Sequence, residues 1–260
     1  MIQEPSDLNW SASSIVEDYT EFSREFFWSS YQWQAAVGLQ RSGLTKRGGK
    51  ILDIGCGPGW MTFILKERSP SSACFGVDLS TEMVEQARVY AQQQQLQDVH
   101  FTVSDVLHLP FEDNLFDLVI SSSSFRLWGD QLRGLQEAYR VLRPGGLLFI
   151  SDIGGDMPKE RQQMLIENTP PTGRTFVIPA LETAFPSAKV EDILRQSNLP
   201  DWECRVGGLC GFSPTDREVM DWLVDGFPLR DLQKSFQGKA WARELRQYWI
   251  CVYLRKPKEE

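Results

Sequence analysis

The sequence predicts an α/β protein in which helices cover both faces of a mostly parallel sheet. Short apolar runs of strand length alternate along the chain with segments of helical periodicity, which is the order of consecutive βαβ units. The run at 116–121 is apolar almost throughout, as expected of a strand that is covered on both faces. The expected strands are 51–54, 74–77, 99–103, 116–121 and 147–151.

The helical segments lie before, between and after these strands. Ser14 and Glu17 have the spacing of a capping box and open a long aromatic helix over 14–40, which a basic, glycine-rich linker follows at 43–50. Further helices are expected over 60–68, 81–95 and 130–142. After residue 152 the alternation breaks, and the expected elements are a short helix at 158–167 in a Pro-, Gly- and Thr-rich stretch, a helix around Val190, a strand at 202–207, a helix from Ser213 and a last strand at 248–254.

The composition is that of an ordinary globular protein. Of 260 residues, 42% are hydrophobic and 24% are charged, which argues against a disordered, collagen-like or coiled-coil chain. The net charge of −8 makes long nucleic acids and anionic membranes poor partners, so we expect neither. A chain of this length can bury a core without disulfides or a metal ion.

Cysteine and histidine are used sparingly. The five cysteines are odd in number and form no CxxC, and the only histidines are His100 and His108, so neither a disulfide framework nor a metal site is expected. The first residues carry no basic, apolar leader, and no apolar run approaches the roughly 18 residues of a membrane span. We therefore expect a reduced, soluble, cytoplasmic protein, and the sequence leaves its oligomeric state open.

The strongest chemical signal is the glycine loop Asp53–Gly59, which lies between an expected strand and an expected helix. Glycine allows a tight turn and lets a ligand approach main-chain N–H groups, while the following helix offers its N-terminus to an anion. No Gly-Lys-Ser/Thr follows, so the loop is not a phosphate loop. Trp60 stands where a dinucleotide-binding loop would have its third glycine, which argues against a pyrophosphate at this place.

Two acids follow the next two strands. Asp78 ends the second strand, about 20 residues past the glycines, where a carboxylate can accept hydrogen bonds from a ribose. Asp105 follows the third strand. Parallel strands bring such loops to one edge of the sheet, so the loop and both acids are expected to converge on one nucleoside.

These motifs, in this order, resemble those of class I S-adenosylmethionine-dependent methyltransferases, most closely the ubiquinone/menaquinone-biosynthesis type and its small-molecule relatives. The resemblance rests on Asp53–Gly59, Asp78, Ser104–Asp105, Leu109–Phe111, Phe116–Val119 and Leu142–Gly146. It implies a Rossmann-like, seven-stranded, mostly parallel sheet whose last strand is antiparallel. It also implies one domain made of an N-terminal helical cover (1–44), a cofactor-binding core (45–155), a lid insert (156–187) and a C-terminal part that completes the sheet (188–260).

The resemblance implies S-adenosylmethionine as the cofactor and assigns residues to it. Asp53 and the loop residues Gly55, Cys56, Gly57 and Gly59 would hold the methionine part and the ribose, and Asp78 would bind the ribose diol. The remaining positions are Leu79 and Met83 beside the adenine, Asp105 with Val106 at the adenine amino group, and Ser121 and Ser122 near the sulfonium.

The acceptor side is less defined. Family members often carry histidines after the fourth strand, and this chain has Arg126 there. Arginine stays protonated and cannot serve as a base, but it can bind a carboxylate or a phosphate. In the family, the N-terminal segment and the insert after the fifth strand commonly cover the substrate, so the expected acceptor contacts are Tyr19, Phe26, Trp28, Tyr31, Arg126 and Arg174.

The sequence thus predicts transfer of a methyl group to a small organic acceptor by in-line displacement, with catalysis mainly through positioning. No general base is identified, and no catalytic residue is assigned. Two alternatives stay open: use of the bound sulfonium for rearrangement, cyclisation or decarboxylation, and a non-enzymatic cofactor-binding module. Oxygen, nitrogen, carbon and sulfur acceptors all occur on this fold, and the fold does not choose among them.

Overall fold

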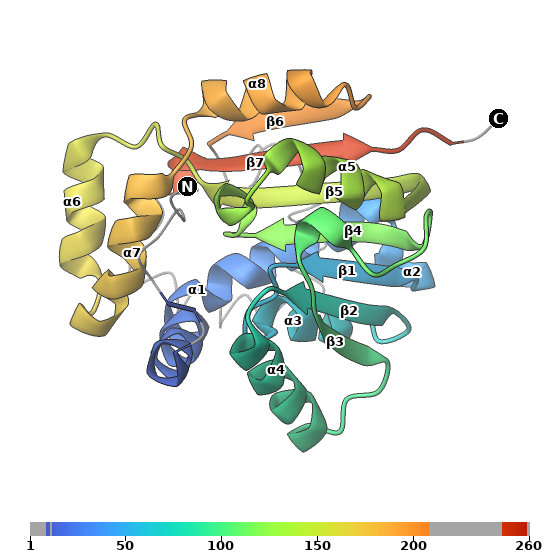
Figure 1. Cartoon of the computed structure of the whole chain (residues 1–260), viewed down its shortest axis with the longest axis horizontal. Coiled ribbons are helices and arrows are strands. Elements are labelled where there is room, and N and C mark those ends of the chain that lie inside the picture. Colours follow the sequence, from blue (N-terminus) through green and yellow to red (C-terminus); the bar gives the residue numbers. More distant parts are fainter. Residues whose placement is uncertain (1–8, 11, 208–245, 259–260) are drawn as a thin grey trace.

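The structure is a computed structural model that describes residues 9–10, 12–207 and 246–258. Its centre is a seven-stranded sheet of order β3-β2-β1-β4-β5-β7-β6 (Figure 1). β7 runs antiparallel to both neighbours, β5 and β6, and the other strand pairs are parallel. The Rossmann-like expectation with an antiparallel last strand is confirmed. The strands are β1 (Lys50–Ile54), β2 (Ala73–Asp78), β3 (Val99–Val103), β4 (Phe116–Ser122), β5 (Leu142–Ile153), β6 (Trp202–Val206) and β7 (Trp249–Arg255).

The predicted helices up to residue 168 are confirmed to within a few residues. The first ends where Gly43 adopts a left-handed φ of 73° and donates to the carbonyls of Gln40 and Leu39. The described helices are α1 (Ser13–Ser42), α2 (Leu44–Arg47), α3 (Trp60–Arg68), α4 (Thr81–Gln93), α5 (Gln131–Val141), α6 (Lys159–Asn168), α7 (Pro171–Thr183) and α8 (Ser187–Ser197). Short 3-10 helices span Val106–His108, Phe125–Leu127 and Arg246–Tyr248.

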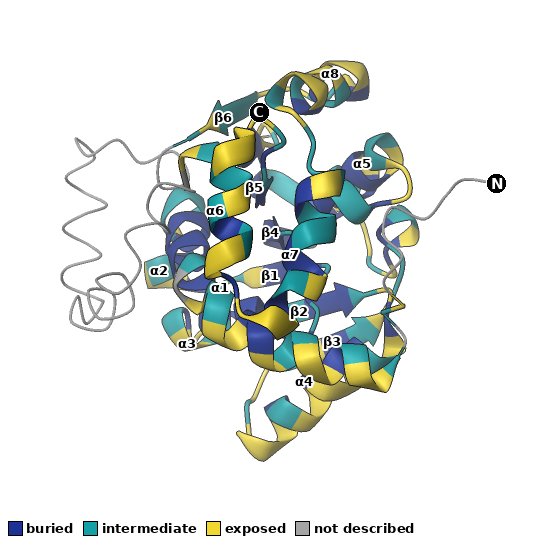
Figure 2. Cartoon of the chain, turned by 90° about the vertical axis from the view of Figure 1, so that its left-hand side faces the viewer, coloured by how far each residue is buried: buried dark blue, intermediate teal, exposed yellow. Residues whose placement is uncertain are grey.

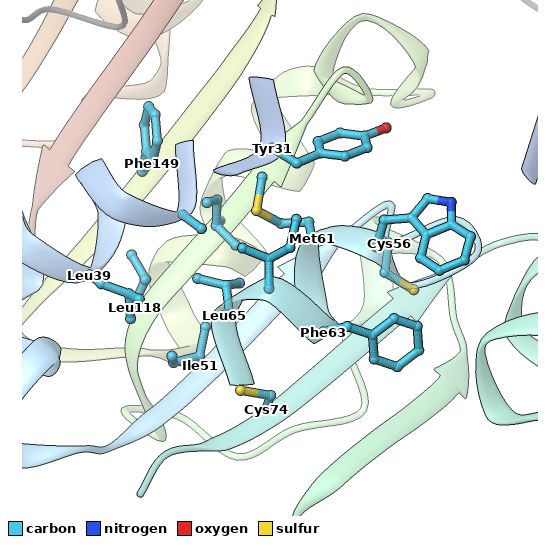
Figure 3. Packing of buried hydrophobic residues seen from close by; sticks show 14 of the residues in the cluster. Tyr31, Leu39, Ile51, Cys56, Met61, Phe63, Leu65, Cys74, Leu118 and Phe149 are labelled. Atoms are coloured by element: carbon cyan, nitrogen blue, oxygen red, sulfur yellow. The ribbon is translucent and has the colours of Figure 1, made fainter. Parts of the chain in front are cut away.

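Each face of the sheet has its own hydrophobic core, because successive residues of a strand point to opposite faces. Ile51 of β1 packs with the second half of α1, with α3 and with α4, whereas Leu52 packs with α5 and α8 on the other face. Figure 3 shows the first of these cores, with Leu39 and Leu118 at one end and Tyr31 near Cys56 at the other. Asp53 follows Leu52 and therefore points to the face of α1 and α3.

A third apolar cluster lies beyond the carboxyl ends of the parallel strands. The first half of α1 packs there with α6 and α7 through Phe22, Leu165 and Phe176. Viewed onto this edge, α6 and α7 lie in front of the strands (Figure 2). The cluster covers the edge at which a ligand of this fold binds.

One predicted feature of this cover is wrong. The sequence predicts a single short helix within 155–187, but the structure has two helices there, because α7 follows α6. Pro171 stands at its first turn, where a missing N–H is tolerated, while Pro179 lies inside the helix and cannot donate a hydrogen bond there. Packing compensates for this loss, because Phe176 and the Cα of Gly173 lie against the ring of Phe22.

Two smaller differences concern segment boundaries. β5 begins at Leu142 rather than at 147 and includes the Pro144-Gly145-Gly146 turn, where its register with β4 shifts. The expected linker at 43–50 contains the short helix α2. The helix expected from Ser213 lies outside the described residues.

The described residues contain neither a helix that could span a membrane nor a cluster that could bind a metal ion. None of their helices has the length and hydropathy needed to cross a membrane. Within the same part of the chain, no group of three or more His, Cys, Asp or Glu side chains is arranged to hold a metal ion.

Candidate functional site

The glycine loop turns back immediately after β1 and joins the neighbouring strand. The N–H groups of Gly55 and Cys56 both donate to the carbonyl of Val77, at 2.8 and 3.0 Å. Gly55, Gly57 and Gly59 have φ angles of +70°, +51° and +87°, a region that other residues rarely adopt. Such a loop leaves the main chain open to a ligand.

Asp78 ties this loop to the start of α4. Its Oδ2 accepts from the N–H of Gly57 at 2.8 Å, and its Oδ1 accepts from the N–H of Ser80 at 3.0 Å. Ser80 in turn caps α4 by accepting from the N–H of Met83, and its hydroxyl donates to the carbonyl of Trp10 at 2.7 Å. Burial raises the pKa of Asp78, and the backbone donors oppose this rise.

Asp53 is more deeply buried and has fewer donors. Only 1% of the residue is exposed. Its Oδ2 accepts from the hydroxyl of Thr62 at 2.6 Å, and its Oδ1 has no hydrogen-bond partner among the described residues. Burial raises the pKa of Asp53 to about 7, the Thr62 hydrogen bond opposes the rise, and the nearby charge of Asp78 adds to it.

The ends of β2 and β3 present both exposed apolar and polar groups. Leu79 is 72% exposed, whereas Met83, also expected beside the adenine, is buried in the core. Asp105 uses its Oδ1 to accept from the N–H of Leu107 at 2.9 Å and so caps the 3-10 helix that begins at the buried Val106. Leu79 and Asp105 thus follow neighbouring strands, and an exposed leucine side chain suits stacking on one side of a flat ring.

The end of β4 carries a cluster of hydroxyl groups. The Oγ atoms of Ser121 and Ser124 are 2.7 Å apart, and the Oγ of Ser124 also donates to the carbonyl of Ile54 at 3.1 Å. The Oγ of Ser122 is buried and has no partner in the described part of the chain. Ser124 also lies against Gly55, so a side chain at position 55 would collide with it. Sequence reasoning missed this role, since a serine in a serine run gives no signal of long-range packing.

Arg126 forms a buried ion pair after β4. Its Nη1 lies 2.5 Å from the Oδ1 of Asp152, and its backbone N–H donates to the Oδ2 of Asp152 at 3.1 Å. The same Nη1 donates to the carbonyl of Ser123 at 2.8 Å. The pair borders a small, mostly apolar cavity between β5, β7 and α8. Asp152, at the carboxyl end of β5, was not predicted, although an acid at that edge is a signal that could have been used.

Tyr19 and Tyr31 of α1 form a hydrogen-bonded pair at the glycine loop. Burial raises the pKa of both phenols; the hydrogen bond between them opposes the rise at Tyr19 and adds to it at Tyr31. The Cε1 of Tyr19 lies 3.8 Å from where a Cβ would stand at Gly57. Trp10 and Phe176 pack edge-to-face on the Tyr19 ring, each with centroids 5.1 Å away. The charges of Arg126, Asp78 and Asp152 all act on Tyr19, which places its phenol centrally in the site.

The other expected acceptor contacts lie farther out in the cover. Phe26 stacks on Phe22 with ring centroids 4.9 Å apart. Trp28 is 37% exposed and packs edge-to-face on Trp60 at 6.3 Å. Arg174 donates to the carbonyls of Thr169 and Glu167, which fixes the end of α6. The structure therefore brings Tyr19, Tyr31 and Arg126 together at the loop.

These groups fit a nucleoside that carries a charged amino-acid part. The unpartnered Oδ1 of Asp53 and the unpartnered Oγ of Ser122 are buried polar atoms, without a partner in the described part of the chain, that a ligand would satisfy. The three positive-φ glycines leave a cradle between them. The cradle lies beside the junction of β1 with β2 and β4, the point of the sheet where ligands of open α/β folds bind.

Fold and site together define the class: the chain has the architecture and the ordered motifs of a class I S-adenosylmethionine-dependent methyltransferase. The profile of a family described as "Methyltransferase domain" (Methyltransf_31) matches residues 45–196. The chain belongs to this family, which confirms the resemblance drawn from its motifs and makes S-adenosylmethionine the cofactor of its class.

Known proteins agree with this assignment. The demethylmenaquinone methyltransferase of Lactococcus lactis subsp. lactis (strain IL1403) is 30% identical over 202 residues, which are 72% of this chain and 79% of that protein. The malonyl-[acyl-carrier protein] O-methyltransferase of Enterobacter lignolyticus (strain SCF1) is 32% identical over 172 residues, 65% of each chain. The demethylmenaquinone methyltransferase of Thermus thermophilus is 38% identical over 143 residues, 54% of this chain and 63% of that one. The chain thus spans a little less than two thirds of two of these relatives.

Solved structures show the same fold. The plantazolicin methyltransferase BpumL in complex with SAH superposes with a TM-score of 0.70 over 93% of this chain and 90% of that one, at 16% identity. At this identity the similarity supports the fold alone.

Proposed function

We propose that this chain transfers a methyl group from S-adenosylmethionine to a small organic acceptor. The observation that carries the proposal is the meeting of the glycine loop, Asp53 and Asp78 with the Tyr19 phenol under one apolar cover. A protein that only binds the cofactor would need the glycine loop, Asp53 and Asp78, but not the phenol. The phenol and the cover provide a closed place for a second molecule.

The cofactor residues follow from the placement of the groups. Asp53, with Gly55, Cys56, Gly57 and Gly59, would hold the amino-acid part and the ribose, and Asp78 would hold the ribose hydroxyls. Leu79, Met83, Asp105 and Val106 would border the adenine, and Ser121 and Ser122 would lie toward the reacting methyl. When bound, S-adenosylmethionine supplies a methyl group on a positively charged sulfur, which needs no further activation.

The chain's own residues would then orient the acceptor and exclude water. A phenol can accept one hydrogen bond while it donates another, so the Tyr19 hydroxyl would accept from Tyr31 and donate its own proton to an acceptor oxygen. Arg126 presents fixed positive charge nearby, held in place by Asp152. The apolar cluster around Tyr19 would exclude water from the site; it includes Trp10, Phe22 and Phe176. In a water-poor site, most of the rate enhancement can come from aligning the methyl donor with the acceptor.

The class of acceptor and the cellular location are also part of the proposal. Relatives are named for demethylmenaquinone and for malonyl-[acyl-carrier protein], both acceptors with carbonyl or hydroxyl oxygens, and we propose such an oxygen-bearing acceptor here. Phe26, Trp28 and Arg174 would contact only its outer part. We propose a cytoplasmic location, which the free thiols of Cys56, Cys74, Cys204 and Cys251 support.

The test begins with cofactor binding. Isothermal titration of the full chain with S-adenosylhomocysteine should show a dissociation constant in the micromolar range, and no binding would reject the proposal. The protein is then incubated with S-adenosylmethionine and a set of small acceptors that includes a naphthoquinol and a malonyl thioester. One S-adenosylhomocysteine released per product supports methyl transfer, whereas product without that release indicates a rearrangement, cyclisation or decarboxylation.

A further inference from the structure

The carboxyl group of Asp53 is unusual because one of its oxygens is buried without a donor. The residue is 1% exposed, its hydrogen bonds come from Thr62 alone, with the hydroxyl of Thr62 2.6 Å from Oδ2, and its Oδ1 has no partner among the described residues. A buried carboxylate with so little compensation is costly, and such a group tends to keep its proton.

The nearby Asp78 has the opposite environment. Both of its oxygens accept backbone N–H bonds, from Gly57 at 2.8 Å and from Ser80 at 3.0 Å. Two buried carboxyl groups that act on each other do not both ionise easily, and the one with more donors keeps its charge. The first negative charge of the pair therefore resides on Asp78, and Asp53 is the group that keeps its proton to a higher pH.

No described cation compensates Asp53. The groups that face it are the phenol of Tyr31 from α1, the thiol of Cys56 in the loop, the hydroxyl of Thr62 on α3, and Cys74 and Asp78 on β2. Lys66 acts on Cys74, but its ammonium group donates to the carbonyls of Pro70 and Ser72. The raised pKa of Asp53, about 7, agrees with this set of neighbours.

With the amino-acid part of the cofactor held at Asp53 as in the proposed function, we propose that Asp53 releases a proton to solvent as the α-ammonium group binds at its Oδ1. The O–H bond of the neutral carboxyl group breaks, the proton leaves to the buffer, and the resulting carboxylate accepts an N–H bond from the ammonium group. The inference rests on the proposed function and adds a consequence to it: cofactor binding and proton release are one coupled event. It also makes Asp53 a specificity-determining residue, because a nucleoside without the ammonium group cannot drive the release.

The expected size of the effect follows from linkage. Asp53 is neutral below a pKa of about 7 in the free protein and charged in the complex, so binding is weakened as the pH falls. Binding should release about 0.9 proton at pH 6, about 0.5 at pH 7 and about 0.1 at pH 8. The affinity should rise toward tenfold per pH unit below pH 6 and level off above pH 8.

The experiment is calorimetric and needs no acceptor. S-adenosylhomocysteine is titrated into the full chain at each of these three pH values, in pairs of buffers that differ in ionisation enthalpy, and the dependence of the heat on the buffer gives the number of protons released. The comparison ligand is 5′-methylthioadenosine, which keeps the nucleoside and lacks the amino-acid part. It should bind with no proton release.

Two variants sharpen the assignment. Asp53→Asn should lose the proton release and the pH dependence, because an amide cannot ionise. Thr62→Val removes the hydroxyl donor to Oδ2 and keeps the side-chain shape, so it should move the proton release to higher pH and give more protons at pH 8 than the wild type.

The outcomes separate the inference from the proposed function. S-adenosylhomocysteine that binds the wild type with no proton released at pH 6 and pH 7 overturns the inference and leaves the proposed function standing. Equal release by 5′-methylthioadenosine, or unchanged release in Asp53→Asn, also overturns it. Failure of the wild type to bind S-adenosylhomocysteine at any pH overturns both.

Discussion

The guanidinium group of Arg126 and the carboxylate of Asp152 form an ion pair in which Nη1 and Oδ1 lie 2.5 Å apart, with only 11% and 8% of the two side chains exposed. The pair joins the segment after β4 to the end of β5 and borders the small cavity between β5, β7 and α8. Removing one partner would leave the other charge buried and alone, which costs much more than the pair contributes.

Asp152→Ala should therefore lower the free energy of unfolding by about 3 kcal/mol, measured by urea denaturation. The double variant Arg126→Met/Asp152→Leu should recover most of this loss, because no isolated charge remains. Asp192→Ala is the control: the side chains of its ion pair with Arg195 are 63% and 57% exposed, and its loss should change stability by less than about 0.5 kcal/mol. Equal losses in the two single variants would contradict this account of the buried pair.

The hydroxyl of Tyr19 is predicted to hold the acceptor. Tyr19→Phe should lower the turnover number by roughly tenfold, the effect of about one hydrogen bond, while the affinity for S-adenosylhomocysteine changes by less than about twofold. Tyr31→Phe removes the hydrogen bond between the two phenols and keeps the Tyr19 hydroxyl, so it should have a smaller effect. The measurement is release of S-adenosylhomocysteine with an acceptor found in the screen; a Tyr19→Phe enzyme with full turnover would remove the phenol from the mechanism.

Gly55 and Gly57 offer a matched pair of substitutions in one loop. Both have positive φ, so alanine at either position should cost about 1 kcal/mol in backbone strain. Gly55→Ala should cost at least about 2 kcal/mol more, because its Cβ would overlap Ser124, whereas at Gly57 the nearest atom is Tyr19 Cε1 at 3.8 Å. Urea denaturation measures the difference, and equal losses would show that Ser124 moves aside.

Pro179 should limit the stability of α7. It lies inside the helix, where its missing N–H leaves the carbonyl of the preceding turn without a helical partner. Pro179→Ala should raise the free energy of unfolding by about 1 kcal/mol and slow proteolysis of the cover. A lower stability would show that the proline shapes the helix for its packing on α1. The matched control is Ala180→Gly in the same turn, which should be destabilising by about 1 kcal/mol.

Glu137 gives a pH-dependent test of the loop that follows β3. Its carboxylate accepts from the backbone N–H of Leu109 at 3.1 Å and from the guanidinium of Arg140, and the hydrogen bond from Arg140 in particular holds its pKa below the usual value. A lowered folded-state pKa contributes stability above the unfolded-state value of about 4.3, and this stability is lost as the pH falls through the folded-state value. Glu137→Gln should thus be destabilised at pH 7, and less so near pH 3. Glu85→Gln, on an exposed pair with Arg88, should match the wild type at both.

The features that sequence could predict are those that depend on neighbouring residues. The strand-loop-helix around Asp53, the acid at the end of β2 and the parallel core of the sheet follow from local patterns and from the rules of parallel sheets. Thr62, Ser124 and Asp152 were missed because their roles arise from contacts between segments far apart in the chain. α7 was missed for a different reason: two prolines argue against a helix locally, and its packing on Phe22 outweighs them.

α1 extends without interruption over 30 residues, a length of about 45 Å. Its second half is fixed in the core through Ala36, Val37 and Leu39, and its first half carries Tyr19 to the proposed ligand site at the glycine loop. The Tyr19 phenol is thus carried by a helix whose second half packs against one face of the sheet. Substitutions meant to change the range of acceptors are best confined to the first turns of α1 and to α7. A substitution at Leu39 that tilts α1 would displace Tyr19, because the helix is continuous between the two residues.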